Sequence, residues 1–173
     1  RLRYIEAAER ELKVCFDEMT GGRETPSLEY DFSFKIKPED AIDPKRAQEV
    51  FFSQLMSSHD REIYAGATLW GIHKDDLIIR LDGKNARNFA SQGQQRSLAL
   101  GLKLSEAAIS ASNTGESPVL LLDDVFSELD AERRSYLCER MKRGQVIMTA
   151  CSDVDLQNEH VNVIRVENGS YCS

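Results

Sequence analysis

The chain has 173 residues, of which 41% are hydrophobic and 29% charged, and its formal net charge is −7. This is a globular composition, and it excludes a protein that binds DNA through overall positive charge alone. No apolar run approaches the roughly 18 residues that a membrane helix requires. The four cysteines form no C-x-x-C pair, which disfavours a disulfide framework or a zinc site, and we expect a cytoplasmic protein.

Hydrophobic periodicity predicts two long helices and a strand in the first part of the chain. A helix is expected from the N-terminus to the glycine pair at 21–22, and alternating apolar side chains predict a half-buried strand over residues 28–36. Asp43 and Pro44 supply an N-cap and a first-turn proline. A second helix is therefore expected from there to about Tyr64.

The middle of the chain contains two short strand patterns followed by a long helical pattern. Strands are expected around residues 67–73 and 76–83, the second ending in an Asp-Gly turn signal. From Gln94 the pattern is helical, and it fades at residues 113–115.

The last part of the chain alternates strands with a helix. A buried strand is expected over residues 119–126, a helix capped by Asp130 over 130–144, and further strands over 145–151 and 161–169. Strands that alternate with helices form parallel sheets. We therefore predict an α/β fold, with a parallel sheet and flanking helices beside a smaller helical and antiparallel subdomain.

Asp123 and Asp124 directly follow the apolar run over residues 119–122. Ligands of open α/β sheets bind outside the carboxyl ends of the strands, so an acid there can hold Mg²⁺ through oxygen. A second, adjacent acid can orient a water for attack on phosphorus. The alternative is that both carboxylates only cap the following turn, and the residues alone leave both interpretations open.

A second stretch, S-Q-G-Q-Q-R, introduces the long helix of the middle region. Ser91, Gln92 and Gly93 are expected just before that helix, where exposed N–H groups and the helix dipole favour an anion. The alternative is an ordinary serine N-cap, and for this stretch taken alone it is the favoured interpretation, because serine caps are common.

Together the two stretches resemble the C-terminal half of an ABC-type ATPase head, in which a signature motif precedes Walker B and the D-loop. The strings SQGQQR, VLLLDD and SELD stand in that order. The resemblance implies that the signature contacts the γ-phosphate of ATP held by the opposite subunit. It also implies that Asp123 binds Mg²⁺ through water and that Asp124 has the position of the catalytic acid. The signature residues are Ser91, Gln92, Gly93 and Gln94, and the D-loop residues are Ser127, Glu128, Leu129 and Asp130.

A narrower resemblance is to the RecF family of bacterial recombination mediators, which is related to the SMC-type head ATPases. It is carried by G-I-H-K-D-D-L at residues 71–77 and by S-Q-G-Q-Q-R with its leucine-rich helix. It implies a weak, DNA-stimulated ATPase that uses ATP and Mg²⁺ and forms ATP-dependent homodimers. The implied partners are DNA at gaps or single-strand/double-strand junctions, RecR and RecO, with RecA loaded as the result.

The same resemblance divides the chain into a lobe II-like part over residues 1–115 and the C-terminal part of an ATPase core over 116–173. The sequence contains no G-x-x-x-x-G-K-[ST] string. A Walker A half is therefore expected upstream of Arg1, and the chain alone is not expected to hydrolyse ATP. Ala150 and Cys151 stand where the switch histidine is expected, which argues for slow or differently organised hydrolysis, and Cys151 is expected to be a buried thiol.

Basic residues form a further group of candidates for contact with DNA or nucleotide, although a solvated face that balances the acidic regions explains them as well. They are His73, Lys74, Arg80, Lys84, Arg87 and Arg96.

Two alternative functions remain open. One is the head of another SMC-like ATPase. The other is a metal-dependent nuclease that uses Asp123 and Asp124 with further converging acids such as Asp75 and Asp76.

Overall fold

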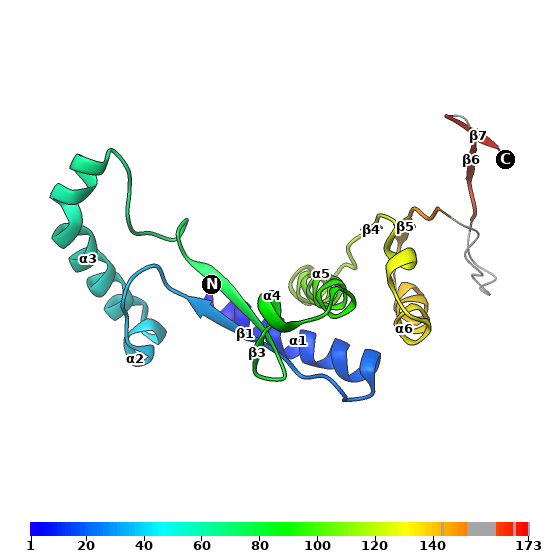
Figure 1. Cartoon of the computed structure of the whole chain (residues 1–173), viewed down its shortest axis with the longest axis horizontal. Coiled ribbons are helices and arrows are strands. Elements are labelled where there is room, and N and C mark those ends of the chain that lie inside the picture. The colour runs from blue at the N-terminus through cyan, green and yellow to red at the C-terminus, as the bar shows by residue number, and fades with distance from the viewer. Residues whose placement is uncertain (143, 152–161, 168, 173) are drawn as a thin grey trace. The chain divides into compact units, whose positions relative to one another are not determined.

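The computed structural model describes residues 1–142, 144–151, 162–167 and 169–172 (Figure 1). It has a mixed α/β fold and divides into two compact units, Arg1–Pro118 and Val119–Ser173. We call them unit 1 and unit 2 and describe each by itself. The assignment of lobe II and ATPase core to residues 1–115 and 116–173 stays a prediction.

Two long helices form the base of unit 1, as expected from their periodicity. Helix α1 (Leu2–Thr20) ends at Gly21, which has a left-handed conformation, and helix α5 (Gln92–Thr114) packs against it. Leu12 and Phe16 of α1 are fully buried. A Cβ atom on Gly101 of α5 would lie 2.8 Å from Leu12 Cδ1 and 3.0 Å from Phe16 Cε2, so the absence of a side chain permits this close approach.

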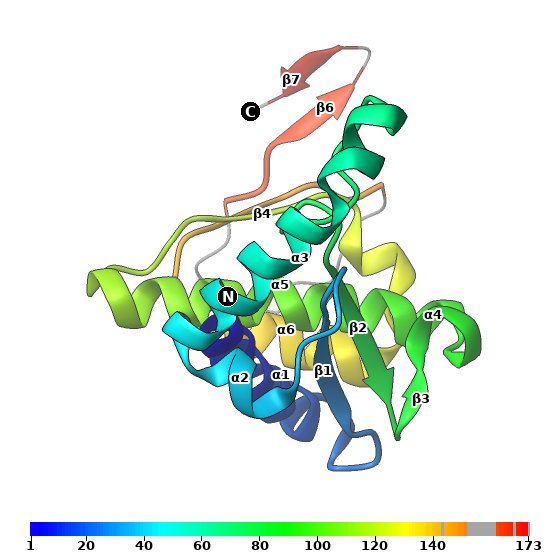
Figure 2. The same cartoon turned by 90° about the vertical axis from the view of Figure 1, so that its left-hand side faces the viewer.

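A three-stranded antiparallel sheet packs with these helices (Figure 2). Strand β1 (Pro26–Asp31) pairs with β2 (Asp76–Leu81), which pairs with the short β3 (Lys84–Asn85). The predicted Asp-Gly turn joins β2 to β3, and Asp82 and Gly83 have φ angles of 51° and 76°, as a tight hairpin requires. Helix α4 (Ala86–Phe89) also contributes a side chain to the buried core of unit 1. The residues of this core are Ala8, Leu12, Phe16, Leu28, Leu81, Ala86 and Leu98.

The strand predicted over residues 28–36 ends at Asp31, because the aromatic residues that continue the alternation pack on one another instead. The ring centroids of Phe32 and Phe34 are 5.8 Å apart, and Phe34 lies 5.1 Å from Phe51 of the following long helix. Sequence alternation therefore overestimates the length of this strand.

The strand predicted over residues 67–73 is wrong, because this segment forms bends and turns. Gly71 has a φ of 141°, and its N–H and C=O both bond the Ser33 hydroxyl at 3.2 Å. The Leu69 N–H donates to the Glu62 carboxylate at 2.7 Å. Side-chain contacts thus replace the ladder bonds that a strand needs.

Helix α2 (Pro38–Ile42) was not expected from the sequence, whereas helix α3 (Pro44–Ala65) follows its predicted signals. The Asp43 carboxylate accepts a hydrogen bond from the Lys45 N–H at 3.0 Å, and Gly66 ends the helix in a left-handed conformation. The N-cap and first-turn proline are confirmed.

Unit 2 is built on two parallel strands. Strand β4 (Leu120–Leu122) pairs with β5 (Val146–Met148), and the 3-10 helix η1 (Val125–Glu128) and helix α6 (Ala131–Met141) connect them. Within the described residues this parallel sheet has two strands, whereas three strands were predicted from the sequence for this part of the chain. The predicted strands are longer than the strands that the structure has at these positions. They were predicted over residues 119–126, 145–151 and 161–169.

The end of the chain forms a hairpin in place of one long strand. Strand β6 (Arg165–Glu167) pairs antiparallel with β7 (Ser170–Cys172). Residues 161 and 168 of the predicted strand over 161–169 lie outside the described residues.

One face of the β4–β5 sheet carries apolar side chains that nothing described covers. Leu121 and Ile147 are register partners and are 74% and 56% exposed. Parallel strands are normally buried on both faces, so this small sheet has the character of part of a larger one. Among the described residues, no helix combines the length and apolarity needed to cross a membrane.

Candidate functional site

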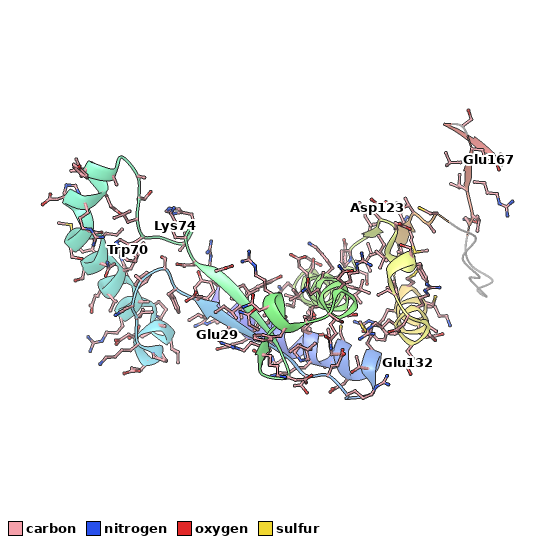
Figure 3. All side chains as sticks on the ribbon, in the orientation of Figure 1. Glu29, Trp70, Lys74, Asp123, Glu132 and Glu167 are labelled. Carbon is pink, nitrogen blue, oxygen red and sulfur yellow. The ribbon has the colours of Figure 1, made fainter. Side chains whose placement is uncertain are left out.

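The two acids follow the end of β4, where the chain turns sharply (Figure 3). Asp123 is exposed, and Asp124 is half-buried with a left-handed backbone at φ 46° and ψ 31°. A residue other than glycine rarely adopts this conformation, and such residues are concentrated at functional sites. Among the described residues, Asp124 Oδ1 is buried and accepts no hydrogen bond.

Thr149 holds both acids from the neighbouring strand end. Its hydroxyl accepts a hydrogen bond from the Asp124 N–H at 3.0 Å and donates to Asp123 Oδ1. Its own N–H donates to the Leu122 carbonyl at 2.9 Å. Sequence reasoning missed this residue. The available signal was the parallel register, because Leu122 pairs with Met148 and the next residue on each strand therefore stands at the same sheet edge.

Cys151 lies close to the acids, in the place where the resemblance leads one to expect a switch histidine. The negative charge of Asp124 raises the pKa of the Cys151 thiol above its usual value. The thiol is exposed, so the expectation of a buried cysteine is wrong. A thiol with a raised pKa is a poor nucleophile at neutral pH, so this arrangement does not indicate a cysteine-based reaction.

The oxygen atoms of this acid pair fit a magnesium ion. Mg²⁺ is usually held by one or two carboxylates together with waters and substrate phosphates. Asp123 and Asp124 supply hard oxygen ligands, and Asp124 Oδ1 is a buried atom that lacks a partner in the part of the chain described. No group of three or more His, Cys, Asp or Glu side chains among those residues is placed to hold a metal. Any ion here would therefore need phosphate and water to complete its ligands.

The residues assigned to the D-loop lie in η1 and at the two cap positions between η1 and α6. The Ser127 hydroxyl donates to the Asp124 carbonyl at 2.9 Å, and Leu129 is buried. Asp130 is the N-cap of α6, and the hydrogen bond from the Arg133 N–H, at 2.9 Å, is the main reason that its pKa is lowered. Glu128 belongs to η1, and its side chain is outside the description. The described D-loop residues are thus fixed to the acid turn and to α6.

The residues assigned to the signature form the N-terminus of α5. Ser91 is the N-cap, and its hydroxyl accepts from the Gln94 N–H at 3.2 Å while Gln94 Oε1 accepts from the Ser91 N–H at 2.9 Å. This is a reciprocal capping box. The helix begins at Gln92, so Gln92 and Gly93 lie in its first turn. From the sequence, both residues were expected just before the helix. A Cβ on Gly93 would meet no atom within 4 Å.

The signature residues belong to unit 1 and the acids and D-loop to unit 2. Each group is therefore arranged by contacts inside its own unit. Their assignments to ATP and Mg²⁺ stay predictions.

The basic candidates are in different surroundings. Arg80 on β2 forms two hydrogen bonds, of 2.7 and 2.9 Å, with Glu29 on β1, so its charge is already balanced within the sheet. The other five are exposed; His73 and Lys74 lie in the turn before β2, Lys84 on β3, Arg87 on α4 and Arg96 on α5.

Asp75, which the nuclease alternative requires, has a role inside unit 1. It accepts hydrogen bonds from the Tyr30 hydroxyl at 2.5 Å and from the Ser33 N–H at 2.8 Å. Burial acts to raise the pKa of Asp75, but these hydrogen bonds outweigh burial and the net pKa is lowered. Asp75 thus fixes the turn that precedes β2.

The chain is similar to several curated proteins described as "DNA replication and repair protein RecF". No protein-family model matches it. It is 39% identical over 153 residues to the protein of Enterococcus faecalis and 42% identical over 156 residues to that of Acetivibrio thermocellus, in each case over 88% of this chain. It is 34% identical over 173 residues to the protein of Clostridium novyi, over 98% of this chain. The chain spans only 40%, 42% and 46% of these three relatives, respectively.

The chain is also similar to solved structures of RecF proteins. The recombination mediator protein RecF-ATPrS of the RecFOR pathway matches with a TM-score of 0.77 and 29% identity, over 98% of this chain and 44% of that one. RecF-ATP of the same pathway matches with a TM-score of 0.68 and 32% identity, over 89% and 41%. A structure from work on ATP-driven dimerization of SMC ATPases matches with a TM-score of 0.56 and 14% identity, over 99% and 84%, which shows a shared fold.

Proposed function

The chain is homologous to part of the RecF proteins of DNA replication and repair, and on that premise we propose that it carries the signature, Walker B and D-loop half of an ATP-dependent DNA clamp. The observation that carries the proposal is the pair of acids at the end of β4. They follow a buried strand end, they are bonded to the adjacent strand, and they belong to a chain that is 39% identical to a RecF protein.

Within this proposal, Asp123 binds Mg²⁺ through water and Asp124 orients the attacking water. Bound Mg²⁺ supplies charge neutralisation at the β- and γ-phosphates. Asp124 has a left-handed backbone, and its Oδ1 is buried without a hydrogen-bond partner among the described residues. Both observations support a role for this carboxylate beyond capping a turn.

The Ser91 turn contributes to the ATP site of a second subunit. Its hydroxyl accepts a hydrogen bond inside the capping box, and the hydroxyl proton can still be donated to a phosphate oxygen. The N-terminus of α5 adds the favourable end of the helix dipole, and the open space around Gly93 allows close approach of a ligand. The capping function and the signature function are therefore compatible.

The Walker A half of the ATP site belongs to another part of the full-length protein. Support comes from the lack of a Walker A string in this sequence and from the lengths of the relatives, of which the chain spans less than half. The exposed Leu121 and Ile147 are further support, because a two-stranded parallel sheet requires additional layers to bury them. The ATPase activity is thus a property of the full-length protein.

The partners follow from the same homology. We propose that ATP binding closes two copies of the full-length protein around DNA at gaps or junctions, that RecR and RecO act with the closed form to load RecA, and that hydrolysis releases the DNA. Because Arg80 is already paired with Glu29, we propose to test His73, Lys74, Lys84 and Arg87 first for DNA contact.

The experiment is a molar mass measurement by light scattering on the full-length protein, with and without ATP and Mg²⁺. Wild type is expected to double its mass with ATP, whereas Ser91→Arg is expected to stay monomeric because the larger side chain occupies the approach to the phosphate. Asp43→Ala is the matched control, since it removes the N-cap of α3, a helix as long as α5 and outside the proposed site. If Ser91→Arg also doubles its mass, Ser91 is only a helix cap and the clamp mechanism is wrong.

A further inference from the structure

The Thr149 hydroxyl has a fixed hydrogen-bond direction. The oxygen accepts from the Asp124 N–H at 3.0 Å, so the single proton is donated, and its acceptor is Asp123 Oδ1. One side chain thus bonds the carboxylate of the first acid and the main chain of the second. It does so from the end of β5, whose pairing with β4 continues through the Thr149 N–H to the Leu122 carbonyl.

We infer that Thr149 is a positioning residue for the acid pair, an inference that rests on the proposed function. Because the hydroxyl occupies Oδ1, Oδ2 of Asp123 is the oxygen that would hold Mg²⁺ through water. By holding the Asp124 N–H, the same hydroxyl keeps the left-handed turn that sets the direction of the Asp124 side chain. Partners that orient a ligand in this way typically change metal affinity about 10–100-fold when they are removed.

The competing explanation is that Thr149 only caps the open end of the β4–β5 pair. Two substitutions separate the explanations. Thr149→Val keeps the branched shape and the main-chain bond to Leu122 but removes both side-chain hydrogen bonds, whereas Thr149→Ser keeps the hydroxyl and removes the methyl group. Thr114→Val is the matched control, because the Thr114 hydroxyl bonds a helix carbonyl at 2.9 Å at the other end of α5 from the signature.

The readout is Mn²⁺ binding to the full-length protein with a non-hydrolysable ATP analogue, followed by electron paramagnetic resonance. Thr149→Val is expected to weaken Mn²⁺ binding about 10–100-fold, and Thr149→Ser and Thr114→Val are expected to bind as wild type does. Wild-type affinity in Thr149→Val overturns the inference. Equal losses in the Val and Ser variants also overturn it, because a loss that occurs although Ser keeps the hydroxyl does not depend on the hydroxyl bonds.

A second readout needs no nucleotide and keeps the test separate from the proposed function. Hydrogen exchange at the Asp124 amide in the full-length protein is expected to be faster in Thr149→Val than in wild type and unchanged in Thr149→Ser. If wild type binds no ATP analogue, the proposed function fails. Unchanged exchange in Thr149→Val contradicts the positioning role, whether or not the wild-type protein binds the analogue.

Discussion

The Ser91–Gln94 capping box of unit 1 closes within a single helical turn, and a hydrogen bond from Gln94 Nε2 to Glu24 Oε1 at 3.0 Å adds to it. The acids of unit 2, in contrast, are held by Thr149, which is 25 and 26 positions away in the sequence. The Ser91–Gln94 capping box needs only its own four residues. The Asp123–Asp124 pair needs the register of two parallel strands. A local contact can form in a short peptide, but a contact between parallel strands requires the crossover between them to fold first.

The two units also differ in how completely their apolar side chains are buried. Unit 1 buries side chains from α1, the antiparallel sheet, α4 and α5 in one cluster. Unit 2 buries Phe126, Leu129 and Leu137 but leaves Leu121 and Ile147 exposed. Unit 1 therefore has the larger buried core, and unit 2 places the acid pair on a sheet with one face that the described residues leave uncovered.

The largest expected effect tests this difference in the cores. Phe16→Ala removes a fully buried ring in unit 1, and we expect it to lower the free energy of unfolding by about 3–5 kcal/mol. Leu121→Ala is the control, because its side chain is 74% exposed and should change the free energy by less than about 0.5 kcal/mol. Denaturant titrations measure both. These values apply to the 173-residue chain, where equal losses would contradict the difference between the two cores. In the full-length protein a larger loss is expected for Leu121→Ala, because the additional layers proposed above would bury its side chain.

A smaller effect is expected where α1 meets α5. Gly101→Ala places a methyl group 2.8 Å from Leu12 Cδ1, and overpacking of this kind costs about 1–3 kcal/mol, only partly offset by less than about 1 kcal/mol of helix propensity. Gly93→Ala, in the same helix but with open space around it, should be neutral or slightly stabilising. Thermal melts compare each variant with wild type. A melting temperature of Gly101→Ala above that of wild type would show that the contact between α1 and α5 is looser than described.

The smallest effect is the pH dependence of the α6 cap. The hydrogen bond from the Arg133 N–H lowers the pKa of Asp130 below its ordinary 3.8, so the stabilisation is present above that value and is lost as the pH falls through the folded pKa. The carboxylate is half-exposed, and solvent screening keeps the contribution small. In Asp130→Asn, which retains a capping oxygen, the acid-induced loss of stability should shrink. An unchanged acid titration of unfolding would contradict this.

The longer helices were predictable from sequence because their ends carry local chemistry, whereas the short helix α2 was not. Asp43, Gly21 and Asp130 mark the ends that the structure has. The strand over residues 28–36 was overestimated, since Phe32 and Phe34 keep the alternation but pack on rings rather than in a sheet. The segment over 67–73 was misassigned because a side chain distant in the sequence, Ser33, binds its backbone.

For the candidate site, the sequence indicated which residues carry chemistry but not how they are held. Asp123 and Asp124 stood out because two acids end an apolar run. Thr149 did not stand out, since a threonine at a strand end has no distinctive local pattern, and its importance arises only from the pairing of β4 with β5. Non-local strand register is the information that a single sequence lacks.

The contact at Gly101 has a mechanical consequence. With Leu12 and Phe16 seated against the backbone of α5, no flexible side chain of that residue separates the two helices, and a closely packed interface transmits displacement without slack. Helix α5 is continuous from Gly101 back to its first turn beside Ser91. Close packing of α1 on α5 therefore couples the position of α1 to that of the first turn of α5, which Ser91 caps.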